Sequence, residues 1–220
     1  MQRSFIVVLI LVAACRPRTA TIQASIPDWD DVAGPVPGLV VSFLPYNRDS
    51  ILAALEGRAD PRPHTRELDS LFQSFRTPFV GFLKAKARLD QLKAAGAPAD
   101  SVAGAVRAVD TARAALEQAR EQWWPAMATY RAGVRQWEDS TYRDYSLITR
   151  SMGERVFANP VSATTDSLGW TTITLTNGRW WATARAIDPA DPNREWYWNV
   201  AITSDTVFLS PQTGRRRPRY

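Results

Sequence analysis

The chain has a single cysteine, Cys15, and a single histidine, His64, among its 220 residues. It therefore cannot form an intrachain disulfide, an all-histidine zinc site or a zinc site built from several cysteines. It also lacks a G-x-S-x-G elbow, a P-loop and a glycine-rich dinucleotide fingerprint. We accordingly predict no catalytic residue, no metal site and no cofactor. A carboxylate pair for glycoside hydrolysis would look like any other acidic residues, so a hydrolase stays open as our third hypothesis.

Long hydrophobic runs are also scarce, and the apolar run at 5–12 is about half of the ~20 residues that a membrane-spanning helix needs. The run follows a positive charge at Arg3 and precedes small residues, which is the pattern of a secretory signal peptide. The segment VAAC at 12–15 also resembles the lipobox of bacterial lipoproteins. In that family the cysteine thiol receives a diacylglyceryl group, the peptide is cut before the cysteine, and the new amine is acylated. We therefore predict a signal peptide at 1–14 and a lipid anchor on Cys15.

The predicted anchor defines the compartment. Arg16 is not the aspartate that retains many lipoproteins in the inner membrane, which favours an outer-membrane protein that faces the periplasm. The alternative is an ordinary secretory signal in which Cys15 is accidental. With the lipobox, the membrane is the first expected partner, bound through lipidated Cys15.

The formal net charge is +5, and the arginines near the end of the chain supply most of it: Arg215, Arg216, Arg217 and Arg219. The rest of the chain is nearly neutral. A nucleic-acid-binding protein needs basic residues spread along one folded surface, so we predict no nucleic-acid partner. We expect 211–220 to be a basic tail, which is either a disordered solubilising end or a contact for anionic lipid headgroups or cell-wall polymer.

The segment 15–36 is rich in proline, aspartate and threonine, and we predict a tether with one short strand around 21–26. Asp28, Asp30 and Asp31 could suggest a calcium loop. Their spacing lacks the glycine and the distal glutamate of a helix-loop-helix calcium site, so no metal is predicted there.

Strand patterns occur in two parts of the chain, 37–58 and 151–210, which we assign to one β-sandwich domain. The individual strands are expected at 38–45, 155–163, 195–203 and 206–209. The first part also contains a short helix at 51–56 with a polar cap before it.

The clearest strand signal is the stretch 164–186. Apolar residues alternate with threonines up to Asn177-Gly178, which is the strongest short sequence signal for a type I′ hairpin turn. On the return strand the same alternation puts Trp180 and Trp181 on opposite faces. We predict a β-hairpin here, with its two strands joined by this tight turn.

Between the two strand regions, 64–145 shows the periodicity of two helices. Apolar residues recur at spacings of three and four, and in the second helix they form a heptad seam. The seam consists of Val102, Val106, Val109, Arg113, Leu116, Arg120, Trp123, Met127, Tyr130, Val134 and Trp137. We predict an antiparallel α-helical hairpin. Either the two stripes bury each other, or part of the stripe, especially Trp123, Trp124 and Trp137, is kept for a partner.

The strand segments follow one another in a recognisable order: proline-glycine before a strand, a D-x-x-G turn, an alternating strand and a glycine-x-aromatic turn. The positions concerned are Pro37, Gly38, Val41, Phe43, Pro45, Asp166, Gly169, Ile173, Leu175, Gly178, Trp180 and Ala184. This order resembles the carboxypeptidase regulatory-like, or transthyretin-like, β-sandwich family. The resemblance implies a small antiparallel sandwich, here with a helical hairpin inserted in one loop. It implies no enzymatic activity.

Aromatic and basic residues are the remaining candidates for binding. They are Trp180, Trp181, Trp196 and Trp198 in the sheet region, Trp123 and Trp124 in the helical region, and Arg215, Arg216 and Arg217 in the tail. Exposed aromatic residues on a sheet can stack on sugars or contact proteins, whereas buried ones fill a core.

We therefore predict an α+β protein, a small antiparallel β-sandwich with a long inserted antiparallel α-helical hairpin. Our first functional hypothesis is a non-enzymatic interaction or scaffolding module of the cell envelope with an envelope protein as its partner. The second hypothesis is a module that binds glycan or peptidoglycan through the tryptophan-rich sheet.

Overall fold

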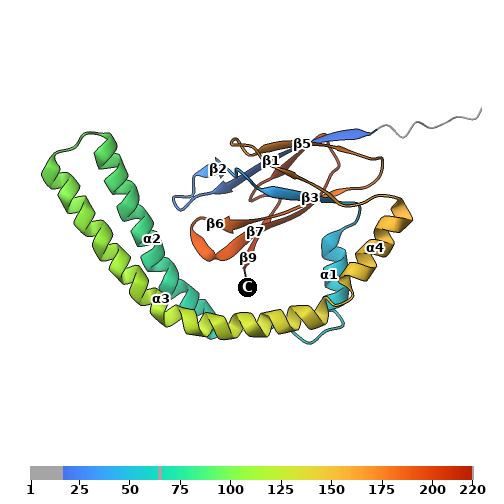
Figure 1. Cartoon of the computed structure of the whole chain (residues 1–220), viewed down its shortest axis with the longest axis horizontal. Helices are drawn as coiled ribbons and strands as arrows, with labels where there is room; N and C mark the ends of the chain where they lie inside the picture. The colour runs from blue at the N-terminus through green and yellow to red at the C-terminus, as the bar shows by residue number, and fades with distance from the viewer. Residues whose placement is uncertain (1–16, 64–65, 220) are drawn as a thin grey trace, which may run out of the picture.

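The structure, a computed structural model, describes residues 17–63 and 66–219. It confirms the predicted α+β class with a long helical hairpin: two β-sheets lie face to face, and a helical segment extends from them (Figure 1). The first sheet contains β2 (Ala33–Pro35), β1 (Arg18–Pro27), β5 (Trp170–Leu175) and β8 (Thr206–Leu209). The second has the order β4 (Val161–Thr164), β3 (Val40–Leu44), β6 (Trp181–Asp188), β7 (Asp191–Ala201) and β9 (Arg215–Pro218). The paired strands are antiparallel except β1 and β8, which are parallel.

The sandwich core lies between the two sheets, where alternating residues of facing strands meet. Its fully buried members include Ala20, Ile22, Ala24, Val41, Phe43, Ala182, Trp198 and Leu209. The segment 15–36 was therefore wrongly predicted as a tether. Its residues 18–27 form β1, which pairs with three other strands of the first sheet. The short strand expected at 21–26 lies within it.

The predicted hairpin across Asn177-Gly178 is wrong. β5 pairs with β1 in the first sheet, while β6 pairs with β3 and β7 in the second, so residues 176–180 cross from one sheet to the other. Gly178 has a φ of 141° but Asn177 is not in the positive-φ region, which a type I′ turn requires at both residues. The strands β5 and β6 each have one apolar face. Because the two sheets face each other, both apolar faces are buried in one core although the strands are not paired.

The helical insertion lies between β3 and β4, which are neighbours in the second sheet with Val40 opposite Thr164. It consists of α1 (Arg48–Glu56), α2 (Arg66–Ala94), α3 (Ala99–Thr141) and α4 (Tyr145–Val156). Our prediction that the helical pattern ends near 145 is wrong, because α4 continues to Val156. The strand expected at 155–163 is present only in its last part, as β4. α1 and α4 pack on each other through a separate apolar cluster that includes Leu55.

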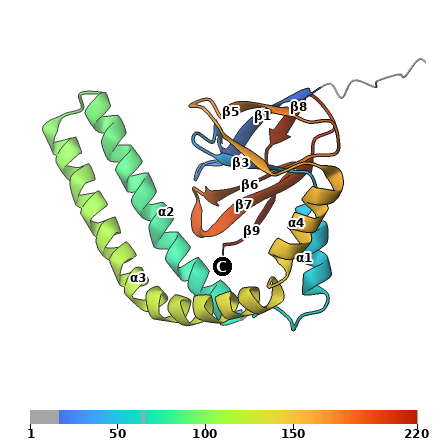
Figure 2. The same cartoon turned by 45° about the vertical axis from the view of Figure 1, so that its right-hand side comes forward.

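The predicted helical hairpin is present, and we call residues 66–130, which comprise α2 and the part of α3 beside it, the arm. Its own core is built around Phe75, Trp123 and Met127, with the Phe75 and Trp123 rings stacked at 5.0 Å between centroids. The arm extends away from the sandwich in two views of the molecule, and the rest of α3 continues below the sheets towards α4 (Figures 1 and 2).

Gly169 provides a test of the turn before β5. Its φ is +78°, and a Cβ atom there would lie 2.4 Å from the carbonyl oxygen of Ala24. We expect Gly169→Ala to lower the free energy of unfolding by about 2 kcal/mol, because both backbone strain and the clash must be relieved. The matched change Gly81→Ala, in α2 with no atom within 4 Å of the new Cβ, is expected to raise it by about 0.5–1 kcal/mol. Urea unfolding followed by circular dichroism measures both, and similar losses in the two variants would contradict this geometry.

Candidate functional site

Cys15, the predicted lipid-attachment residue, lies outside the residues that the structure describes, and so does His64. None of the described helices is long and apolar enough to cross a membrane. The lipid anchor therefore stays a prediction from the sequence.

The predicted sheet tryptophans are largely inside the protein. Trp180, Trp196 and Trp198 belong to the sandwich core and expose at most 9% of their surface. Trp198 is fully buried and donates its indole N–H to the carbonyl oxygen of Ser210 at 2.9 Å. Trp181 is half-buried on the other face of β6, as the alternation predicts. The tryptophan-rich sheet is thus core and not a flat aromatic platform, and the glycan-binding hypothesis loses three of its four sheet residues.

The prediction of a basic tail at 211–220 is also wrong, because residues 215–218 form β9 at the edge of the second sheet. The arginines of this strand are paired with carboxylates from distant parts of the chain: Arg215 with Asp49, Arg216 with Asp188, and Arg217 with Glu195. Asp188 and Glu195 are buried, so each needs a cation beside it. These three arginines therefore hold the end of the chain to the sheet.

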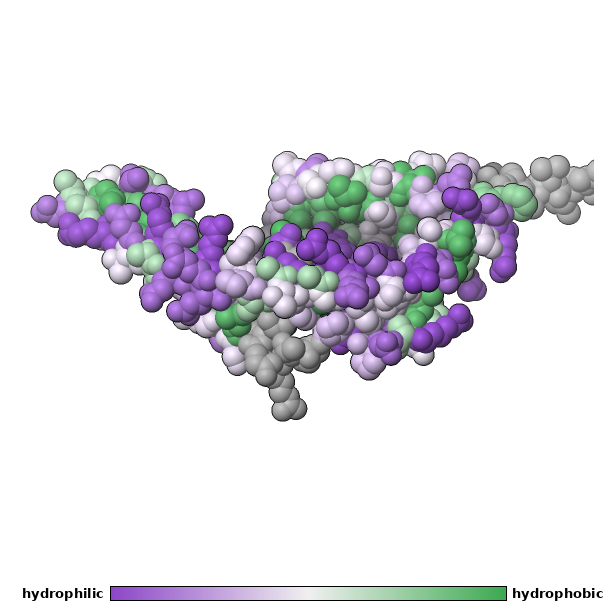
Figure 3. Space-filling model, turned by 60° about the horizontal axis from the view of Figure 1, so that its bottom comes forward, coloured by the Kyte–Doolittle hydropathy of each residue, from purple (hydrophilic) through white to green (hydrophobic). Residues whose placement is uncertain are grey.

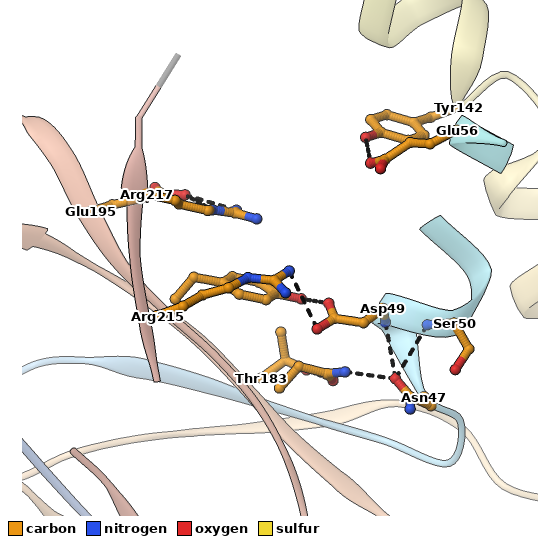
Figure 4. A network of polar contacts seen from close by, with 11 residues as sticks. Asn47, Asp49, Ser50, Glu56, Tyr142, Thr183, Glu195, Arg215 and Arg217 are labelled. Atoms are coloured by element: carbon orange, nitrogen blue, oxygen red, sulfur yellow. Dashed lines mark hydrogen bonds and ion pairs between the residues drawn. The ribbon is translucent and has the colours of Figure 1, made fainter. Parts of the chain in front are cut away.

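On its outer face, the second sheet meets the first turn of α1 through a polar network (Figure 4). The side chain of Asn47 accepts hydrogen bonds from the backbone N–H groups of Asp49 and Ser50, which caps α1, and from the side-chain amide of Asn199 at 2.7 Å. The Tyr197 hydroxyl donates to Asp49 at 2.5 Å, and the Arg215 guanidinium lies 3.3 Å from the same carboxylate. We call Asn47, Asp49, Tyr197, Asn199 and Arg215 the polar joint.

Aromatic stacking reinforces the polar joint. The guanidinium carbons of Arg215 and Arg217 lie 4.9 and 3.9 Å from the centre of the Tyr197 ring. Arg217 in turn pairs with Glu195 at 2.8 Å. A cavity of about 410 Å³ lies beside these groups, between α1, the end of α3, and strands β7 and β9.

Tyr197 of the polar joint, and Tyr46 and Tyr142 outside it, hold their protons to high pH. Burial, followed by the hydrogen bond to Asp49, raises the pKa of Tyr197 from 10.0 to about 12. Burial and the nearby Tyr145 phenol raise the pKa of Tyr46 to about 12. Burial and the hydrogen bond to Glu56 raise the pKa of Tyr142, and burial lowers the pKa of Arg185. Neutral phenols are therefore favoured in the folded chain.

These shifts predict a loss of stability in alkali. Because Tyr46 and Tyr197 have higher pKa values in the folded chain than in the unfolded one, their contribution is fully present below pH 10 and is lost as the pH rises towards about 12. Urea unfolding across this interval should show a falling midpoint. In the double variant Tyr46→Phe/Tyr197→Phe the fall should be shallower, and an identical fall would show that other groups cause it.

The polar joint makes structural contacts between the second sheet and the start of α1. In the part of the chain that the structure describes, no three His, Cys, Asp or Glu side chains gather as a metal site would require. The carboxylate of Asp49 in the joint and that of Glu195, which pairs with Arg217, are each engaged by a tyrosine or arginine partner. What the joint can do is fix the direction in which α1 and the following helices leave the sandwich.

Of Trp123 and Trp124, the two candidate binding residues of the helical region, one is buried and the other is exposed. Trp123 exposes 6% of its surface and packs inside the arm, whereas Trp124 exposes 53%. The Arg131 guanidinium lies 5.4 Å from the Trp123 ring centre and 5.7 Å from that of Trp124. Trp137, the third tryptophan predicted to be kept for a partner, is also buried, so Trp124 alone of the three is exposed to a partner.

The polar joint is not predicted by any local pattern in the sequence. The capping role of the Asn47 segment was visible in the sequence, but its partner Asn199 lies 152 residues away. A comparison with known protein families, curated proteins and solved structures finds no match for this chain.

Proposed function

We propose that the protein is a lipid-anchored envelope protein that acts as a non-enzymatic interaction module, with the arm as the surface that docks an acidic face of a partner protein. The observation that carries this proposal is the arm itself, a two-helix extension that touches β7 through α2 and whose tip lies well beyond the sandwich in both views (Figures 1 and 2). Such an extension adds little to the sandwich core, because its buried residues pack against one another.

The charge of the distal arm indicates the chemistry of the partner. Residues 80–115 contain six basic side chains, and all of them are exposed: Lys84, Lys86, Arg88, Lys93, Arg107 and Arg113. The same segment has three acidic residues, Asp90, Asp100 and Asp110, so its net charge is +3 (six minus three). An acidic surface on the partner would be complementary to it and would be attracted at a distance.

The arm also exposes apolar side chains beside these charges. Val106 and Trp124 expose 40% and 53% of their surface. Hydrophilic residues cover much of the arm on the face shown in Figure 3, with hydrophobic residues near its tip. A mixed surface with a few apolar anchors is typical of specific but non-obligate protein interfaces.

The polar joint supports this role because it holds the helical insertion at a fixed angle to the sandwich. Tyr197 and Asn199 on β7 bind the first turn of α1, and Trp137 of α3 donates its indole N–H to the Asp60 carbonyl at 2.6 Å, in the segment between α1 and α2. Because these contacts fix α1 and α3 next to the arm, the arm is already ordered before a partner binds. Binding then has no large entropy cost.

A photoreactive residue placed along the arm tests the proposal in native membranes. We expect position Val106 or Ala114 to give one discrete protein adduct, and Ile187, an exposed sandwich residue of β6, to give none. Adding Lys84→Glu and Lys86→Glu should reduce the adduct, whereas Lys84→Arg and Lys86→Arg should not, because the charge is retained. The absence of any protein adduct from the arm, or the same adduct from Ile187, would overturn the proposal.

A further inference from the structure

A second cavity, of about 740 Å³, lies between α1, α4 and the crossover segment 177–181. Its apolar walls include Ile51 and Leu55 of α1 and Ile148 and Met152 of α4. Clefts of this volume with mainly apolar walls are typical of sites that hold small molecules.

The cleft is built from a packed scaffold. Ile51 and Leu55 are buried in the cluster that joins α1 to α4, where Ile148 and Met152 pack against them. Trp180, buried in the sandwich core, and half-buried Trp181 contribute to the opposite side. The walls therefore exist before any ligand binds, which lowers the cost of binding.

Charge complementarity indicates the polar part of the ligand. Two exposed arginines, Arg58 and Arg179, line the cleft, and none of its lining residues is acidic. Within residues 17–63 and 66–219, neither arginine is found in an ion pair. A carboxylate or phosphate group is the ligand group that guanidinium binds best.

The position of the cleft indicates the bilayer as a source for the apolar part of the ligand. Arg18 is paired with Leu175, two residues before the cleft residue Asn177. Cys15 is three residues before Arg18, a reach of at most about 11 Å. With the anchor proposed above, the cleft would lie near the bilayer surface, whereas its apolar walls and free arginines do not depend on that anchor.

We propose that this cleft binds a single-chain anionic amphiphile, with the acyl chain between the apolar walls of α1 and α4 on one side and the crossover segment 177–181 on the other, and the anionic head at Arg58 and Arg179. A free fatty acid and a lysophospholipid share this chemistry.

Equilibrium dialysis with radiolabelled palmitate tests the site on the chain from Arg16 to Tyr220, which contains every described element. Ala54 is exposed and lines the cleft, so Ala54→Trp fills the space and should weaken palmitate binding at least about tenfold. The matched change Ala114→Trp, exposed on the arm, should leave binding unchanged. Equal affinity of the Ala54→Trp variant and the unaltered chain, or no saturable binding, would overturn the proposal.

Substitutions of the two exposed arginines test where the anionic head group of the ligand binds, and they add no bulk to the cleft. We expect Arg58→Gln/Arg179→Gln to weaken palmitate binding several-fold while uncharged hexadecanol binds as before. Unchanged palmitate binding in this variant would overturn the assignment of the anionic head. Competition separates the two sources: displacement of palmitate by lysophosphatidylglycerol at lower concentration than by unlabelled palmitate assigns a membrane lipid, and the reverse order assigns a free fatty acid.

Discussion

Replacing Cys15 with alanine is expected to move the protein from the membrane fraction to the soluble fraction almost completely. Lipidation needs the thiol, and Cys15 is the only cysteine in the chain. Each acyl methylene buried in the bilayer contributes about 0.8 kcal/mol, so several chains on one residue give a stable anchor that is lost in one step. Fractionation with a high-salt wash and metabolic labelling with radioactive palmitate measure the two consequences.

Arg16→Ala serves as the control for the Cys15 experiment, because it changes the neighbouring residue and keeps the thiol. This variant should remain in the salt-washed membranes and should be labelled. Retention of Cys15→Ala in the washed membranes would show that another part of the chain attaches the protein, and the lipobox assignment would then be wrong.

The Trp198→Ala change is expected to cause the largest loss of stability. The Trp198 side chain is fully buried, its indole N–H bonds to Ser210, and Gly214 approaches the ring so closely that a Cβ there would lie 2.4 Å from the indole nitrogen. Truncation leaves a cavity between the sheets and should lower the free energy of unfolding by about 3–5 kcal/mol. Urea unfolding monitored by circular dichroism gives the difference.

Trp124→Ala is the matched control, since the same truncation removes a side chain that is 53% exposed on the arm. We expect it to cost less than about 1 kcal/mol. Comparable losses at the two positions would contradict the burial that separates the sheet tryptophans from the surface of the arm.

Local alternation predicted which face of a strand a residue occupies, but not which strand lies beside it. Trp180 and Trp181 were placed correctly on opposite faces of the chain. The partner strands of β5 and β6 were predicted wrongly, because an apolar face is satisfied equally by a hairpin neighbour or by a facing sheet. The choice is made by packing among residues far apart in the sequence, which a local window does not contain.

Composition was misleading at the two ends of the sandwich. The arginines at 215–217 have the composition of a tail, and only the distant carboxylates of Asp49, Asp188 and Glu195 make them part of a sheet. In 15–36 the prolines and aspartates suggested a tether. The alternation of Ala20, Ile22, Ala24 and Ile26 was nevertheless visible, and all four side chains are buried in β1. Periodicity was the more reliable guide there.

The arm was predicted well because its information is local. The heptad seam of α3 faces α2, and Val109, Trp123 and Met127 of that seam are buried. Arg113 and Arg120, which interrupt the seam, are exposed. The candidate site was predicted less well, since both the polar joint and the apolar cleft are formed by segments that are far apart in the chain.

The central claim, that the arm docks a partner protein, is tested most directly by an amine-reactive cross-linker applied to native membranes. The only lysines of the chain are Lys84, Lys86 and Lys93, and all three are exposed on the distal part of α2. We predict one discrete protein adduct, identified by mass spectrometry through these lysines. It should disappear in the variant Lys84→Arg/Lys86→Arg/Lys93→Arg, which keeps the charge and removes the amines. No protein adduct in the unaltered chain, or an adduct that persists in the arginine variant, would contradict the claim.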